Sequence, residues 1–256
     1  MSEFVYLQRR RDGGVEHLVL NRPEVRNALN EESIAELTAW ARGAAADDEL
    51  RAVVITGAGP SFCSGADLAW MAKMAGYTRE DNLRDAAAAA AMFDALNTLP
   101  VPVIVRVHGA ALGGGAGLVA VADIAVADES ATFGFTEVRL GLIPAIIAPY
   151  VLAKIGSSAA RELFVTGRRF SAEHAREIGL VHAVVAADQL DRAVQRYLDN
   201  IMANGREAMT EAKALLREIS NRSIRDATPL ATEAIAMRRV SAEAQERMLA
   251  FLKKGT

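Results

Sequence analysis

The residues best suited to do chemistry lie between Val101 and Pro144, where a glycine cluster and one acidic residue follow an apolar strand. The run VPVIVRV is rich in β-branched residues, which is typical of a buried strand. Gly113, Gly114 and Gly115 then precede an apolar run that is predicted to form a short helix. Backbone N–H groups in the first turn of a helix have no intrahelical acceptor, so this loop is suited to binding an anion.

Glu137 is the acidic candidate in the same stretch. A carboxyl beside the apolar residues of 140–143 is expected to have a raised pKa, which suits proton transfer near neutral pH. From the residues alone, two plainer interpretations stay open. The glycines are consistent with a tight turn or close backbone packing, and Glu137 is consistent with an ion pair to Arg139 or Arg106.

Four segments together resemble the crotonase (enoyl-CoA hydratase/isomerase) superfamily, and they cover nearly the whole chain. They are the stretch from Gly109 to Glu137 with three glycines and F-G-x-x-E, LNRPEVRNALN (Leu20 to Asn30), VVITGAGPSFCSGADL (Val53 to Leu68) and TGRRFSAEHAREIGLV (Thr166 to Val181). The resemblance implies an α/β fold, a crotonase-like spiral of ββα units with a C-terminal helical trimerisation region. Periodicity by itself does not distinguish that spiral from a doubly wound sheet.

The resemblance also implies where the reaction takes place. The N–H groups of Ala66 and Gly114 match the family's oxyanion hole, which needs small residues because a large side chain would obstruct the thioester oxygen, and Glu137 matches its catalytic acid. Contacts with the acyl-CoA substrate are expected at Arg26, Ala28, Ser64, Ala66, Asp67, Leu68, Gly114, Phe251 and Lys254. Asp67 also has a purely structural interpretation as a helix N-cap.

Several side chains are expected to shape the acyl pocket. Trp70, Met71 and the residues of 145–147 are the candidates. Met92 and Phe93 stand at helical spacing, which is more typical of core residues than of a pocket lining.

The sequence departs from the family pattern at Gly117, where two-acid hydratases carry the first of their two glutamates. The run from Ala145 to Tyr150 looks like the branch of bacterial methylglutaconyl-CoA hydratases, which also tends to have this glycine. The resemblance therefore favours an enoyl-CoA hydratase, a lyase of fatty-acid or branched-chain catabolism, acting on 3-methylglutaconyl-CoA or a related branched acyl-CoA. A Δ3,Δ2-enoyl-CoA isomerase with one glutamate base and a non-catalytic CoA-ester-binding protein stay open as alternatives.

Composition narrows the class of protein further. A chain of 256 residues with 51% hydrophobic residues can bury a large core, and a net charge of −3 gives no signal for nucleic-acid binding. With a single cysteine, Cys63, the chain cannot form an intrachain disulfide and has no pair of cysteines spaced as zinc ligands. We therefore expect a protein of the reducing cytoplasm without a bound metal. We also expect no cofactor apart from the coenzyme A of the substrate. No apolar stretch reaches the roughly 20 residues of a membrane helix, so no membrane partner is expected.

Local patterns predict the elements that must position these residues. Arg11 to Gly14 is a hairpin signal, Asn30 and Asp67 are predicted helix N-caps, and Pro100 ends an alanine-rich helix. The expected strands are 3–8, 15–20, 53–56, 101–107, 123–127 and 131–135.

The C-terminal part is predicted to be helical and to join subunits. From residue 187 apolar residues recur at amphipathic spacing among charged ones, which predicts a spiral core over 1–195 and a helical region over 196–256. The apolar faces of this helical region are larger than a small appendage could bury by itself, so we expect it to contact other subunits. The resemblance implies that the assembly is a homotrimer or a hexamer. In the family such a region often covers a neighbour's site, and Phe251 and Lys254 match positions that reach the CoA nucleotide.

Overall fold

The computed structural model describes residues 4–254, except for the side chain of Lys254. Its strands form a six-stranded sheet in the order β1-β2-β3-β4-β6-β9 and a three-stranded sheet in the order β5-β7-β8. The strands are β1 (Leu7–Asp12), β2 (Val15–Leu20), β3 (Ala52–Gly57), β4 (Val103–Val107), β5 (Ala110–Leu112), β6 (Ile124–Asp128), β7 (Thr132–Gly134), β8 (Arg169–Ser171) and β9 (Ala183–Val185).

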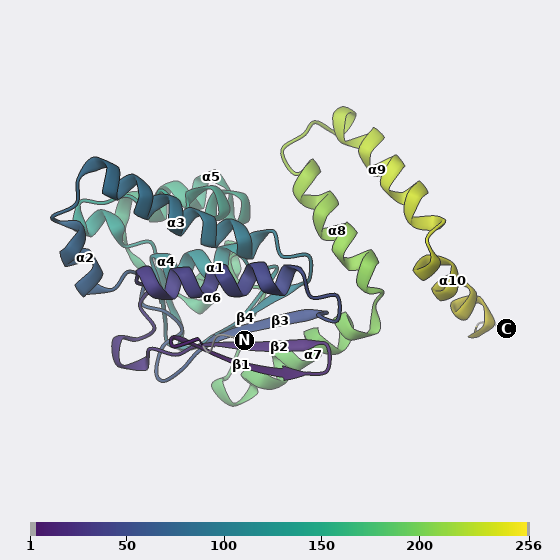
Figure 1. The fold of residues 1–256 in the computed structure, drawn as a ribbon, viewed down its shortest axis with the longest axis horizontal. Helices are drawn as coiled ribbons and strands as arrows, with labels where there is room; N and C mark the ends of the chain where they lie inside the picture. Colours follow the sequence, from purple (N-terminus) through teal and green to yellow (C-terminus); the bar gives the residue numbers. More distant parts are fainter. Residues whose placement is uncertain (1–3, 255–256) are drawn as a thin grey trace.

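Helices cover the sheets and then extend beyond them (Figure 1). They are α1 (Glu31–Ala45), α2 (Leu68–Met74), α3 (Arg79–Asn97), α4 (Gly114–Val121), α5 (Ala148–Thr166), α6 (Ala172–Glu177), α7 (Leu190–Ala203), α8 (Arg206–Ile219), α9 (Ile224–Arg239) and α10 (Ala242–Lys254), with short 3-10 turns η1 (Pro23–Val25), η2 (Glu137–Leu140) and η3 (Ala187–Gln189). Within the described residues, no helix combines the length and the apolar character that a membrane crossing requires.

Strand β3 is buried on both faces, and the two faces belong to two different apolar clusters. Val53 and Ile55 pack in the cluster that includes residues of α1, α3 and α4. Val54 points the other way and belongs to the cluster that α7 contributes to through Leu190 and Leu198. Because side chains alternate along a strand, one short apolar run fills both layers.

The chain winds through the two sheets in repeated turns. β4, β5 and α4 form one turn, and β6, β7 and α5 form the next. β4 pairs with β6 in the large sheet, whereas β5 pairs with β7 in the small one, and both pairings are parallel. Each turn therefore adds one strand to each sheet before its helix, which confirms the ββα spiral and excludes a single doubly wound sheet.

The first hairpin is shifted from its predicted position. β1 begins at Leu7 and includes all three arginines of 9–11, instead of ending at Gln8. The pairing of Asp12 with Val15 leaves a two-residue turn, in which Gly13 has a φ of +52°. Residue 3 of the predicted strand lies outside the described residues. The shift arises because the turn sets the register, and Arg9 then pairs with Glu16 at 2.6 Å.

Both predicted N-caps are confirmed. The Asn30 side chain accepts a hydrogen bond from the Ser33 N–H at 2.9 Å, and the Ser33 hydroxyl accepts one from the Asn30 N–H. This reciprocal pair begins α1, and the Asp67 carboxylate begins α2 by accepting from the Ala69 N–H at 2.7 Å.

The loops after β2 and β3 are held together by a buried residue that sequence reasoning missed, Asn27. Its amide donates to the carbonyls of Ala58 and Ser61 at 2.8 Å, and its side-chain oxygen accepts from the Arg22 N–H at 2.9 Å. The backbone of Asn27 is left-handed, with a φ of +56°, as is that of Arg26 at +53°. Asparagine tolerates a left-handed backbone better than most residues do. Asn27 in the motif RNALN is therefore the sequence feature that could have predicted this turn.

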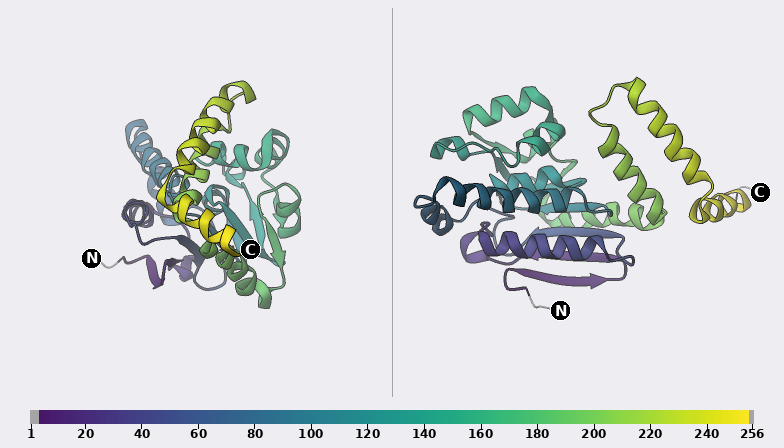
Figure 2. Two further views of the ribbon diagram at one scale, coloured as in Figure 1. Left: turned by 90° about the vertical axis from the view of Figure 1, so that its right-hand side faces the viewer. Right: turned by 45° about the horizontal axis from the view of Figure 1, so that its top comes forward.

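Helices α8, α9 and α10 form an arm that extends away from the sheets (Figure 2). The predicted boundary after residue 195 falls inside α7, whose residues Leu190, Val194 and Leu198 are buried against the large sheet. The arm therefore starts at α8, and its exposed apolar residues include Ile224, at 87% exposure.

We expect Asn27→Ala to destabilise the fold by about 2–4 kcal/mol, because two buried carbonyls lose their donor. Urea unfolding measures this change. Arg26→Ala is the matched control, since Arg26 shares the left-handed backbone but is exposed, and it should change stability by less than about 0.5 kcal/mol. Equal losses in the two variants would show that the backbone conformation, not the amide, is what matters.

Candidate active site

Two backbone N–H groups converge on one pocket from different parts of the chain. The Leu29 N–H donates to the Gly65 carbonyl at 2.7 Å, and the Asp67 N–H donates to the Leu29 carbonyl at 2.9 Å. Ala66 lies between these two bonds, so its own N–H points away from Leu29 and finds no acceptor within the described part of the chain.

Gly114 supplies the second N–H group. It is the first residue of α4, so its N–H has no intrahelical acceptor, and the positive end of the helix dipole lies at the same place. Gly114 and Ala66 both line the pocket. The two N–H groups that the sequence predicted as an oxyanion hole are therefore brought to one cavity.

The neighbouring glycines permit the close backbone approach that this arrangement needs. A Cβ atom on Gly115 would lie 2.2 Å from the Cys63 carbonyl oxygen, so no other residue fits between α4 and the loop after β3. Gly113 has a φ of +49°, and a Cβ atom there would lie 3.2 Å from Glu137 Oε1. The glycine cluster thus serves both close packing and the open helix end.

The Glu137 carboxyl lies beside this helix end. Its Oε2 atom is buried and has no hydrogen-bond partner within the described residues. Burial raises the pKa of Glu137 above its usual 4.5, against a smaller lowering effect of its own backbone. No ion pair links Glu137 to Arg139 or Arg106 in the described part, and Arg106 pairs with Asp191 instead.

The source of this burial differs in part from the prediction, because Ile143 shares the pocket with Glu137 but Leu140 and Leu142 do not. Leu140 and Leu142 are 61% and 52% exposed, so they do not enclose the carboxyl. Glu137 begins the 3-10 turn η2, which carries the residues after it toward the surface. The residues that share its pocket, such as Phe93 and Ile147, provide the apolar surroundings.

The pocket is small and apolar, with a volume of about 170 Å³. Trp70 and the residues of 145–147 line it as predicted, whereas Met71 does not. The full lining is Leu29, Ile34, Ala66, Trp70, Ala89, Met92, Phe93, Gly114, Glu137, Ile143, Pro144, Ala145, Ile146 and Ile147. Met92 and Phe93 are at once buried core residues and pocket residues, so the two interpretations of their spacing are both correct.

The position of the missing glutamate is filled by a neighbour. A Cβ atom on Gly117 would lie 2.3 Å from Ile147 Cγ2 and 3.0 Å from Phe93 Cε1. Gly117 is buried in α4, so Ile147 occupies the space that a side chain would need. Glu137 is thus the one carboxylate among the residues that line the pocket.

The predicted substrate-contact residues on the two loops lie together. The Ser64 N–H donates to the Arg26 carbonyl at 3.0 Å, and Ala28 is buried beside them. Leu68 is 81% exposed at the start of α2.

Asp67 has the structural role that its N-cap position suggested. Its carboxylate pairs with Arg22 at 2.8 Å, and Arg22 also donates to the Ala28 carbonyl at 2.6 Å. Burial alone would raise the pKa of Asp67, but the hydrogen bonds from Arg22 and the helix N–H groups hold it below its usual value.

Phe251 is not brought to this site within one chain. It lies on α10 and is 78% exposed, beside Arg247, Met248 and Leu252. The side chain of Lys254 lies outside the described residues. No group of three metal-binding side chains occurs in the described part.

Comparisons with known proteins identify the family and the fold. The family model for enoyl-CoA hydratase/isomerase matches residues 10–256. A crystal structure of an enoyl-CoA hydratase from Shewanella pealeana superimposes with a TM-score of 0.95 at 38% identity, over 98% of this chain and 95% of that one. An enoyl-CoA hydratase from Mycobacterium smegmatis gives 0.93 at 36% identity, over 97% and 96%. A crotonyl-CoA hydratase from Syntrophomonas wolfei is 31% identical over 93% of this chain and 91% of its own length.

We expect Gly117→Ala to destabilise the fold by about 1–3 kcal/mol through overpacking, and to cost clearly less when it is introduced into Ile147→Ala, which removes the clashing side chain. Urea unfolding of the wild type, both single variants and the double variant measures this. Unchanged stability in Gly117→Ala would contradict the packing argument.

For the same reason, Gly117→Glu should not raise the hydration rate of crotonyl-CoA or 3-methylglutaconyl-CoA. The new side chain meets Ile147, and a buried carboxylate without a partner is costly. A tenfold increase, about 1.4 kcal/mol in the barrier, would show instead that the missing acid is a deficit.

Proposed function

Because the chain belongs to the enoyl-CoA hydratase/isomerase family, we propose that this enzyme adds water to an α,β-unsaturated acyl-CoA thioester. The relatives named as hydratases, including the crotonyl-CoA hydratase of Syntrophomonas wolfei, support this activity. The observation that carries the proposal is the unpartnered carboxyl oxygen of Glu137 beside the open N-terminus of α4.

The thioester oxygen binds between the N–H groups of Ala66 and Gly114. When water adds to the β carbon, negative charge moves onto this oxygen, and both N–H groups and the dipole of α4 stabilise the enolate. A donor of this kind is typically worth about 2.7–4 kcal/mol in the barrier.

Glu137 transfers the proton. Its carboxylate takes a proton from the attacking water as the new C–O bond forms, and the resulting carboxylic acid then protonates the α carbon of the enolate. The raised pKa suits the first step, because it makes the carboxylate a better base near neutral pH.

The second candidate activity is Δ3,Δ2-enoyl-CoA isomerisation. It needs only one base, which moves a proton between two carbons, and the filled space at Gly117 favours it because no second carboxylate lines the pocket. A hydratase removes the ultraviolet absorbance of a conjugated enoyl thioester, and an isomerase creates it from a 3-enoyl substrate. A non-catalytic CoA-ester-binding protein does neither.

The acyl group is short and uncharged. No lysine, arginine or histidine lines the pocket of about 170 Å³, so the second carboxylate of 3-methylglutaconyl-CoA would lack a partner there. A crotonyl-sized chain meets only apolar side chains. Turnover rates with a panel that includes crotonyl-CoA and 3-methylglutaconyl-CoA therefore distinguish a short, uncharged substrate from the methylglutaconyl-CoA substrate that the sequence suggested.

Coenzyme A enters as part of the substrate, and the mechanism needs no other cofactor. We place its contacts on Arg26, Ala28, Ser64, Asp67 and Leu68, on two loops that the hydrogen bond from the Ser64 N–H to the Arg26 carbonyl joins. We propose a cytoplasmic location, which a chain with one cysteine and therefore no intrachain disulfide supports.

We propose a homotrimer or a pair of stacked trimers, which the exposed apolar residues of the arm support. These residues need a partner surface, and Phe251 can meet a CoA nucleotide only if it reaches a neighbouring subunit. Those residues are Leu216, Ile224, Ile235, Met237, Val240, Met248, Leu249, Phe251 and Leu252.

We expect Glu137→Gln to lower the turnover rate by about 10²–10⁴-fold with CoA-ester binding near normal, because the amide keeps the shape but carries no transferable proton. In the wild type, the acidic limb of the rate profile should lie above pH 4.5. Retention of more than about a tenth of the rate would remove Glu137 from the mechanism.

Stability provides the control for the same variant. The raised pKa of Glu137 means that the folded state disfavours the ionised carboxyl, so its stabilising effect is present below pH 4.5 and is lost as pH rises through the folded pKa. Glu137→Gln should therefore be at least as stable as the wild type at pH 7, and a marked loss there would indicate a structural role.

We expect a solution mass of three or six times the 27.3 kDa of one chain. Small-angle scattering or analytical ultracentrifugation at micromolar concentration measures it. A monomer would contradict the assignment of the arm.

A further inference from the structure

Trp70 forms part of the wall of the catalytic pocket, and it is the one residue of α2 (Leu68–Met74) that is buried. Its indole N–H donates to Asp85 Oδ1 of α3 at 3.2 Å. Asp85 lies one turn before Ala89, which lines the same pocket. The hydrogen bond therefore joins α2 to α3 at the pocket wall.

The Asp85 carboxylate has no other hydrogen bond and no ion pair within the described residues. It is half-buried, and burial raises its pKa, against a lowering effect of the Trp70 hydrogen bond and with a further raising effect of the Glu31 charge. The Trp70 side chain is 8% exposed, and a buried indole N–H needs an acceptor. Asp85 is therefore the group that keeps this ring in the wall.

The rest of α2 is held by a different set of bonds. Glu31, the first residue of α1, accepts from the Tyr77 hydroxyl at 2.6 Å and from Lys73 Nζ at 2.9 Å. These bonds fix the end of α2 and the turn after it without Asp85. Loss of the Asp85 carboxylate should therefore free the Trp70 ring and leave the helix in place.

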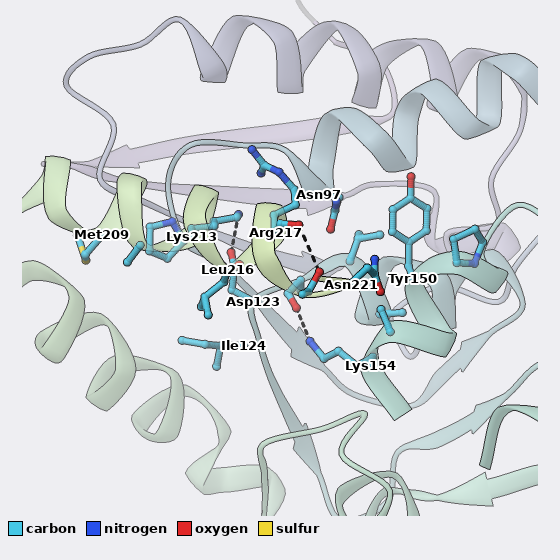
Figure 3. Close-up of a pocket in the computed structure, with 18 of the residues that line it drawn as sticks. Asn97, Asp123, Ile124, Tyr150, Lys154, Met209, Lys213, Leu216, Arg217 and Asn221 are labelled. Carbon is cyan, nitrogen blue, oxygen red and sulfur yellow. Dashed lines mark hydrogen bonds and ion pairs between the residues drawn. The ribbon is translucent and has the colours of Figure 1, made fainter. Parts of the chain in front are cut away.

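Core packing closes the pocket at another point. Phe93 lies about two turns after Asp85 on α3, is buried, and has its ring 6.2 Å from that of Tyr150. Tyr150 lines a separate cavity of about 770 Å³ between α8 and the core (Figure 3). The two cavities share no lining residue. A longer acyl chain cannot pass Phe93 without displacing the core, whereas the Trp70 ring closes the side toward α2.

We propose that Asp85 is a positioning residue that limits the length of the acyl chain, because it holds the Trp70 ring in the pocket wall. The inference rests on the proposed function in one respect, namely that this pocket receives the acyl group of a CoA thioester. When the indole has no acceptor, the ring leaves the wall, and a longer aliphatic chain buries its methylene groups along α3.

Calorimetric titration of the full-length protein with butyryl-CoA and octanoyl-CoA tests this inference. The wild type should bind octanoyl-CoA no more than about twofold tighter than butyryl-CoA, since the added methylene groups find no room. Asp85→Ala should bind octanoyl-CoA at least about fivefold tighter than the wild type does, with butyryl-CoA changed by less than about twofold. Alanine suits the helix, so α3 should persist.

Two matched variants isolate the hydrogen bond. Asp85→Asn keeps an oxygen that accepts from the indole, so it should retain the chain-length preference of the wild type. Asp94→Ala removes an exposed carboxylate from the same helix and should also retain it.

The role of Trp70 is tested directly in a double-mutant cycle. Trp70→Ala should by itself tighten octanoyl-CoA binding, and Asp85→Ala should add nothing in that background. Trp40 and Trp70 are the two tryptophans of the chain, and both are buried. Asp85→Ala should therefore increase acrylamide quenching of the fluorescence, and the increase should be absent when Trp70 is alanine.

Unchanged octanoyl-CoA affinity in Asp85→Ala, an equal gain in Asp85→Asn, or additive effects of Asp85→Ala and Trp70→Ala would each overturn the inference. Both ligands are saturated and binding is measured, so a wild type without hydration activity would contradict the proposed function and leave this test intact. If neither acyl-CoA bound, the premise that the pocket receives an acyl group would be wrong, and the inference with it.

Discussion

The close approach of α4 to the loop after β3 is the constraint on which the site depends. Gly115 lies so near the Cys63 carbonyl that a Cβ atom would be 2.2 Å from its oxygen. The Cys63 carbonyl also accepts a hydrogen bond from the Leu112 N–H at 3.0 Å, which holds the loop beside β5. This contact sets the loop that carries Ala66 against the helix that begins at Gly114. Two N–H groups far apart in the chain therefore face one pocket.

Asn27 and Asp67 hold the other side of that loop. Asn27 binds the carbonyls of Ala58 and Ser61, and Asp67 pairs with Arg22 while it caps α2. These polar groups are buried, so each must be satisfied, and their bonds leave Ala66 with its N–H directed to the pocket. The polar network of Asn27, Asp67 and Arg22 thus positions the Ala66 N–H group without a direct contact to it.

Glu137 is one of five described residues with a buried side-chain atom that lacks a hydrogen-bond partner, and the one carboxylate among them. Its buried oxygen has no partner within the described residues, and burial raises its pKa. A buried carboxyl without a partner costs stability, because burial disfavours its ionised form. The apolar side chains of Phe93 and Ile147 both create that environment and close the space at Gly117. One packing arrangement therefore explains the raised pKa and the lack of a second acid.

The sequence by itself determined the local features, since these depend on neighbouring residues. Asn30 and Asp67 were recognised as N-caps and the glycine cluster as a helix start, and Glu137 was singled out as the candidate acid. Only the tertiary structure decided which N–H groups lack acceptors, that Ile147 fills the space at Gly117, and that Phe251 lies on a separate arm. It also brought Lys154 of α5 and Lys213 of α8 near the carboxylate of Asp123. Such contacts join residues far apart in the chain, and hydrophobic spacing records which face is buried but not what it is buried against.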